Sequence, residues 1–146
     1  MQIAEIMTRN VECTKPGASL MDAARKMKEL DVGPLPVCGD DDRLVGMLTD
    51  RDIVVRGVAD RRDMEQTKVQ DIMTREVDYC MEDQPVEHAA RLMREKQIRR
   101  LVVLNQNRRL VGIVSLGDLA VDAQDEALVE SALEGISQPS APRRRK

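Results

Sequence analysis

Apolar residues recur at helical spacing in two segments of the chain. In residues 19–30, SLMDAARKMKEL, the positions of Leu20, Ala23, Met27 and Leu30 fall on one face of a helix, and Ser19 precedes them as an N-cap residue. Residues 84–97, QPVEHAARLMREKQ, repeat this pattern. Both segments are therefore predicted to form amphipathic helices.

Short apolar runs follow each of these helices. Residues 34–39 and 43–49 flank the turn DDD, and residues 98–104 and 110–115 flank the turn NQNRR, so each pair predicts a hairpin or neighbouring strands of one sheet. Residues 10–14, NVECT, and 77–80, VDYC, predict a strand before each helix, and a second helix is expected to start at residue 50 and near Leu116. Residues 119–136 predict a terminal helix with one apolar face, formed by Leu128, Ala132, Leu133 and Ile136.

This order of elements occurs twice, 66 residues apart. GMLTDRD at 46–52 matches GIVSLGD at 112–118, and residues 3–54 align with 69–120 without a gap. We therefore expect a first repeat at 1–60, a linker at 61–68, a second repeat at 69–122, a C-terminal helix at 123–137 and a disordered basic tail at 138–146. One such unit is too small to bury both sides of its sheet, so the two are expected to pack sheet against sheet.

The amino-acid composition of the chain argues against nucleic acids and membranes as partners. The chain has one Tyr and neither Phe nor Trp, so it lacks the aromatic rings that usually stack on single-stranded nucleic acid. The net charge is −3 although the last four residues are all basic, so the rest of the chain is acidic and does not suit a nucleic-acid or membrane surface. The basic tail is interpreted as a solvated end, and a contact for an anionic partner is the less favoured alternative. No membrane-length apolar run and no signal peptide are evident, and a cytoplasmic location is expected.

Three cysteines and one histidine, without CxxC spacing, do not predict a metal site. The cysteines are interpreted as small apolar residues of strands. Cys13 and Cys38 fall in two strands that are expected to lie side by side, so a disulfide between them is an alternative to two packed thiols. A reducing cytosol favours the thiols.

The chain from about residue 3 to 120 resembles a tandem pair of cystathionine beta-synthase (CBS) domains, a Bateman module. The IMT start (6–8 and 72–74), the AA-x-x-M helix and the G-h-h-[ST]-x-x-D end, where h is apolar, each occur twice in order. The resemblance implies an α/β (α+β) fold of two β-α-β-β-α repeats, packed sheet to sheet with pseudo-two-fold symmetry. It also implies two clefts between the repeats that can hold adenosine nucleotides.

The doubled motif has a chemical interpretation in such a family. Its aspartate can accept hydrogen bonds from both ribose hydroxyls, and its hydroxyl residue lies near a helix N-terminus that favours phosphate. Its glycine would let the strand approach a flat adenine. The alternative is that Asp50, Asp52 and Asp118 only charge or cap the first turn of a helix, with Thr49 and Ser115 as caps.

The resemblance assigns residues of both repeats to each cleft. Site A has two arginines where site B has Gly33 and Pro34, so site A is expected to bind the more phosphorylated ligand, unless these arginines are only exposed charges at a strand end. Glu12 and Asp78 depart from the apolar or small residues usual beside the adenine. Site A comprises Met47, Thr49, Asp52, Asp78, Ile98, Arg99 and Arg100, and site B comprises Glu12, Val32, Gly33, Arg51, Ile113, Ser115 and Asp118.

The function predicted is that of a regulatory module without catalytic activity. No motif places a nucleophile or general base, so an enzyme is not expected, and no cofactor is required. The candidate ligands are AMP, ADP and ATP or a related adenosyl compound, and the output would pass to a separate regulated protein. A homodimer is expected because one copy is not expected to cover the apolar helix faces that contain Met21, Met27, Met93, Leu128 and Leu133. The alternative function is a ligand-free structural or adaptor dimer in a stress response.

Overall fold

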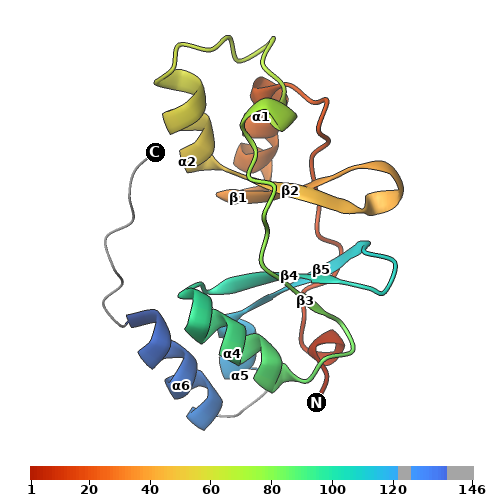
Figure 1. Cartoon of the computed structure of the whole chain (residues 1–146), viewed down its shortest axis with the longest axis vertical. Helices are drawn as coiled ribbons and strands as arrows, with labels where there is room; N and C mark the ends of the chain where they lie inside the picture. The colour runs from red at the N-terminus through yellow and green to blue at the C-terminus, as the bar shows by residue number, and fades with distance from the viewer. Residues whose placement is uncertain (122–125, 138–146) are drawn as a thin grey trace. The chain divides into compact units, whose positions relative to one another are not determined.

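The computed structural model describes residues 1–121 and 126–137 and shows a mixed α/β fold with two repeats of strands and helices (Figure 1). The main elements of the two repeats have the same bounds 66 residues apart, which confirms the register of the duplication. Helix α1 (Leu20–Leu30) corresponds to α4 (Val86–Lys96), β1 (Pro34–Cys38) to β4 (Arg100–Leu104), and β2 (Leu44–Thr49) to β5 (Leu110–Ser115). The short helices η1 (Ile3–Glu5) and α3 (Val69–Ile72) also correspond.

Both long helices bury the apolar face that the sequence predicts. Ser19 caps α1, because its Oγ accepts a hydrogen bond of 3.1 Å from the Asp22 N–H. The helices end at Asp31 and Gln97, both in the left-handed conformation. Met27 and Met93 are 6% and 0% exposed, so the expectation that they lie on uncovered faces is wrong. They are core residues, since they share the buried face with the neighbouring alanines.

The predicted hairpins are present, but the first strand of the first repeat is not. β1 pairs antiparallel with β2, and β3 (Tyr79–Met81) joins β4 and β5 in a three-stranded sheet. Of residues 10–14, only Thr14 pairs, in a parallel bridge to Val37, with hydrogen bonds to the Pro36 carbonyl (2.9 Å) and from the Cys38 N–H (3.0 Å). The next parallel pair would need an N–H from Pro36, and proline has none, so the ladder stops at one bridge.

The chain divides into two compact units that do not follow the repeat boundaries. Unit 1 contains residues 1–9 and 79–103 and the described residues from 112 onward, and unit 2 contains residues 10–78 and 104–111. Residues 1–9, which open the first repeat, therefore belong with helix α4, and residues 69–78, which open the second, belong with helix α1. In unit 1, the Ile3 N–H donates to the Gln84 carbonyl at 2.9 Å.

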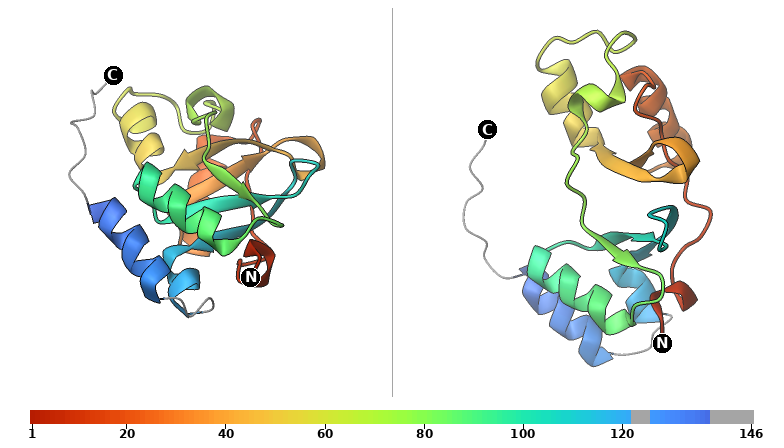
Figure 2. Two further views of the ribbon diagram at one scale, coloured as in Figure 1. Left: turned by 60° about the horizontal axis from the view of Figure 1, so that its bottom comes forward. Right: turned by 45° about the vertical axis from the view of Figure 1, so that its right-hand side comes forward.

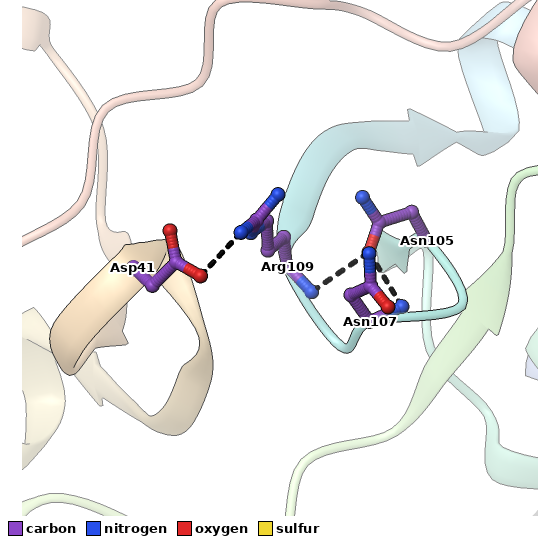
Figure 3. Close-up of polar contacts among 4 residues, drawn as sticks. All are labelled: Asp41, Asn105, Asn107 and Arg109. Atoms are coloured by element: carbon purple, nitrogen blue, oxygen red, sulfur yellow. Dashed lines mark hydrogen bonds and ion pairs between the residues drawn. The ribbon is translucent and has the colours of Figure 1, made fainter.

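Unit 2 is built on a core of α1, the β1–β2 hairpin and α3. Its largest members include Leu20, Leu35 and Leu48, which are at most 1% exposed. After β2 the chain forms α2 (Asp50–Asp52) and continues as η3 (Ile53–Val58), in agreement with the helix expected from residue 50. The β4–β5 loop also belongs to this unit, and its Arg109 binds Asp41 of the β1–β2 loop, which holds the pKa of that exposed carboxyl below its usual value (Figure 3).

The terminal helix expected over 119–136 is found as two helices. α5 (Leu116–Val121) and α6 (Glu126–Ser137) flank residues 122–125, which lie outside the described residues, as does the predicted basic tail at 138–146. α6 lies beside α4 in unit 1 (Figure 2) and buries Ala132 to 1% exposure. The side chain of Leu128, which the sequence also placed on the apolar face, is likewise outside the described part.

Candidate functional site

In unit 2 the doubled motif forms a helix cap at the end of β2. The Asp52 N–H donates to Thr49 Oγ1 at 3.0 Å, and the Thr49 N–H donates back to Asp52 Oδ2 at 3.0 Å. This reciprocal pair is a capping box, in which an aspartate replaces the more usual glutamate or glutamine. The half-buried Asp52 side chain is thereby fixed at the strand end.

Unit 1 contains the same cap. The Ser115 N–H donates to Asp118 Oδ2 at 2.8 Å, and the Asp118 N–H donates to Ser115 Oγ at 3.1 Å. Thr49 with Asp52 and Ser115 with Asp118 therefore cap their helices, and a ligand-binding role of the two aspartates stays a prediction. In the described part of the chain each cap uses only Oδ2 of its aspartate, so Oδ1 keeps its capacity to accept a hydrogen bond from a ligand hydroxyl.

The glycine of each motif lies against another segment of its own unit. A Cβ at Gly46 would be 2.8 Å from both Met73 Sδ and the Thr74 carbonyl oxygen, and one at Gly112 would be 2.7 Å from Met7 Sδ. The backbones pair here, since Met47 and Thr74 exchange hydrogen bonds of 2.8 and 2.9 Å. The expectation that these glycines leave room for an adenine is wrong, because protein atoms fill that room.

A pocket of about 790 Å³ lies within unit 1, a size typical of small-molecule sites. It brings together residues that the sequence assigned to two different sites, the strand-start arginines of site A and Ser115 of site B. Sequence reasoning did not include α6 in any site, although its apolar face was recognised. The lining consists of Ile98, Arg99, Arg100, Ser115, Leu116, Gly117, Ala120, Val129 and Leu133.

The side chains of the two arginines of this pocket are exposed and form no hydrogen bond or ion pair with any residue that the structure describes. Their backbone is fixed, because the Leu116 N–H donates to the Arg99 carbonyl at 2.9 Å. The equivalent bond in unit 2 runs from the Asp50 N–H to the Gly33 carbonyl at 3.1 Å. The Asp50 carboxylate lies beside Gly33, where a Cβ would be 3.2 Å from its oxygens. The same backbone frame therefore carries two cations in unit 1 and a carboxylate in unit 2.

The remaining predicted site residues are found in both units. Since sites A and B each draw residues from both units, their assembly stays a prediction. Met47 and Ile113 are half-buried strand residues whose backbones bond to Thr74 and Thr8. In unit 2, Glu12, Val32, Arg51 and Asp78 are exposed, and Gly33 is half-buried.

Cys13 and Cys38 are neighbours in unit 2 and are free thiols in the structure. The interaction between their two thiols lowers the pKa of Cys13 to about 6, with further help from Lys15 and Lys26, and raises the pKa of Cys38. Burial alone raises the pKa of Cys80 to about 12.

Neither a metal-binding cluster nor a membrane-spanning helix is found in the described part of the chain. No group of three His, Cys, Asp or Glu side chains there is arranged to hold a metal ion. Among these residues, no helix has the length and apolar character needed to cross a membrane.

The chain belongs to the CBS domain family, whose model matches residues 3–58 and 69–122. Hypoxic response protein 1 of Mycobacterium tuberculosis is 38% identical over 137 residues, which are 94% of each chain. A CBS domain-containing protein of Bacillus subtilis, YhcV, is 42% identical over 135 residues, covering 92% of this chain and 94% of YhcV.

Three solved structures share the fold at sequence identities from 26% to 39%. That of hypoxic response protein 1 with two coordinated zinc ions has a TM-score of 0.74 at 39% identity, covering 82% of this chain and 97% of that one. A CBS domain protein from Pyrobaculum aerophilum complexed with AMP has a TM-score of 0.72 at 26% identity, covering 92% and 99%. The CBS domain pair of protein MJ0100, in complex with 5′-methylthioadenosine and S-adenosyl-L-methionine, has a TM-score of 0.69 at 28% identity, covering 82% and 93%.

Proposed function

We propose that this chain is a regulatory CBS pair that binds an adenosine nucleotide and signals this binding to a separate protein. The observation that supports this most is the unit 1 pocket, in which Arg99 and Arg100 have no partner among the described residues. Guanidinium groups match phosphate oxygens in charge and geometry. The AMP complex of the Pyrobaculum relative agrees with a nucleotide ligand.

The charge of the pocket favours a phosphorylated ligand over a sulfonium compound. S-adenosyl-L-methionine, which MJ0100 binds, carries a positive sulfonium that two guanidinium groups would repel. AMP, ADP and ATP instead bring one or more phosphates to Arg99 and Arg100. We therefore rank the three nucleotides above the adenosyl compounds, with site A as the site for the more phosphorylated ligand.

Asp52 and Asp118 are proposed to bind ribose hydroxyls while they cap their helices. Both carboxylates are half-buried at the end of a strand, and their Oδ1 atoms accept nothing from the described residues. A carboxylate has acceptor sites enough for a backbone N–H and a ligand hydroxyl together. The cap would then orient the ligand-binding group.

Isothermal titration with AMP, ADP, ATP and S-adenosyl-L-methionine tests this function. We expect saturable binding of at least one nucleotide, and Asp52→Ala should weaken binding at site A by about 10- to 150-fold, because a charged hydrogen-bond partner contributes about 1.5–3 kcal/mol. Asp52→Asn is the matched control for folding, since its amide oxygen can still accept from the Thr49 N–H. Wild-type affinity in a folded Asp52→Ala protein would remove this residue from the site, and no binding across the panel would favour the ligand-free adaptor.

We also propose that the module is a homodimer. Val54, Val55 and Val58 on η3 are 58%, 47% and 58% exposed, a group of apolar side chains that a second copy could cover. Light scattering at micromolar concentration should give twice the chain mass of 16.4 kDa. A mass of 16.4 kDa would contradict the dimer.

A further inference from the structure

Helix α6 forms an apolar wall of the pocket that contains Arg99 and Arg100. Val129 and Leu133 are one helical turn apart on α6, and both line the pocket. The helix lies outside the segments 3–58 and 69–122 that match the CBS family, so it is an addition to the repeats. An element added to the repeats thus completes a pocket whose other residues come from the second repeat.

The position of α6 depends on a close approach to α4. A Cβ at Gly135 would lie 2.0 Å from Arg94 Cγ and 2.8 Å from Arg94 Cα, so only glycine permits this contact. Two hydrogen bonds hold the same contact, from Arg94 Nη1 to Ser131 Oγ at 2.6 Å and from Gln97 Nε2 to the Gly135 carbonyl at 3.3 Å. Gly135 is not part of the pocket lining, so α6 can be displaced by a change that leaves the pocket residues intact.

Unit 2 has neither this wall nor the pair of arginines at the start of the strand. Val54, the repeat counterpart of Ala120, is 58% exposed. Gly33 and Pro34 stand at the positions that Arg99 and Arg100 occupy in unit 1, with the Asp50 carboxylate beside Gly33. The combination of two guanidinium groups with an aliphatic wall is therefore special to unit 1.

We propose that α6 is the ligand-responsive element of this chain, and that it is held on α4 and α5 by an anionic group bound in the unit 1 pocket. This inference rests on the proposed nucleotide-binding function and names its regulation. A phosphate bound at the arginines would be partly shielded from water by Val129 and Leu133, and a charge contact is stronger where water is excluded. If docked α6 strengthens phosphate binding by some factor, bound phosphate must favour docking by the same factor.

Hydrogen exchange of residues 126–137 in the full chain measures the docking directly. With ATP, ADP or AMP, whichever binds most tightly, at 100 times its dissociation constant, exchange in α6 should slow by up to about 100-fold if the open form does not bind. The peptide over α1, in unit 2, serves as the internal reference. Arg99→Ala combined with Arg100→Ala should abolish the slowing.

Two variants with a matched control test the reciprocal effect, in which docked α6 strengthens nucleotide binding. Gly135→Leu should displace α6, and Leu133→Asp should place a carboxylate in the wall, so each should weaken nucleotide binding by about tenfold or more. Glu134→Gln changes an exposed residue of the same helix and should bind as the wild type does. Near-wild-type affinity in the first two variants, with folding confirmed by circular dichroism, would overturn the inference.

The outcomes separate this inference from the proposed function. Nucleotide binding that depends on Asp52 but leaves exchange in α6 unchanged would refute the role of α6 and keep the proposed function. No binding of any nucleotide would refute both. Slower exchange in α6 together with weaker binding in Gly135→Leu would support both.

Discussion

The glycine of the doubled motif offers a stringent test of how the two units are built. Gly46 lies on β2, opposite the segment that contains Met73 and Thr74. Gly46→Ala adds one methyl group, whose carbon would be 2.8 Å from the Met73 sulfur and 2.8 Å from the Thr74 carbonyl oxygen. The thioether can move, but the carbonyl cannot move without disturbing the two hydrogen bonds between Thr74 and Met47.

The cost of this methyl group can be worked out from these contacts. Overpacking a well-packed site costs about 1–3 kcal/mol. Loss of one of the two backbone hydrogen bonds adds about 0.5–1.5 kcal/mol. We therefore expect Gly46→Ala to lower the free energy of unfolding by about 2–4 kcal/mol, which corresponds to a fall in Tm of about 4–16 °C at roughly 2–4 °C per kcal/mol.

Urea and thermal unfolding followed by far-ultraviolet circular dichroism provide the measurement. Gly17→Ala is the control, because an added Cβ there meets nothing within 4 Å, and the change should be neutral or stabilising by about 0.4–1 kcal/mol. Gly112→Ala should cost about as much as Gly46→Ala, since its Cβ would lie 2.7 Å from Met7 Sδ and 2.8 Å from the Thr8 carbonyl oxygen. A Gly46→Ala protein as stable as Gly17→Ala would refute the reasoning.

Two further predictions concern the cap and the thiols. Ser115→Ala should lower the free energy of unfolding by about 1 kcal/mol, measured by urea denaturation, because it removes the acceptor for the Asp118 N–H; no change would contradict the capping role. Cys13, whose lowered pKa of about 6 leaves it largely thiolate at pH 7, should be alkylated by iodoacetamide faster than Cys80, and its rate should fall about tenfold per pH unit below 6. A rate that instead titrates near pH 8.5 would contradict the thiolate, and alkylation of all three cysteines in unreduced protein would exclude the bridge to Cys38.

Periodicity and duplication were sufficient to predict most of the fold. The two long helices and both hairpins have the predicted places, because helical and strand spacing of apolar residues reports directly on burial. The prediction of a strand at 10–14 was wrong because strand propensity does not show which strand would pair with it. That partner is β1, which contains Pro34 and Pro36. Met27 and Met93 were misplaced because a methionine on a helix face has the same spacing whether a neighbour covers it or not.

The candidate site was predictable where its chemistry is local. The capping boxes follow from the spacing of Thr49 and Asp52, since all their partners lie within four residues. The neighbours of Gly46 lie more than 25 residues away in the chain, so nothing in the local sequence favours protein over ligand beside this glycine. The wall formed by Val129 and Leu133 also depends on tertiary packing, which an apolar stripe alone does not specify.

Gene duplication explains why ligand preference should depend on few positions. Hydrogen bonds of the backbone frame recur in both copies, as in the pairs Asp50–Gly33 and Leu116–Arg99, so these bonds cannot distinguish one copy from the other. The side chains carried by that frame differ in sign of charge. The carboxylate beside Gly33 would repel a phosphate in unit 2, whereas Arg99 would attract a phosphate in unit 1. Both effects favour phosphate binding in unit 1. Exchanging the single pair Gly33 and Arg99 should therefore change the preference of each copy while leaving its backbone bonds in place.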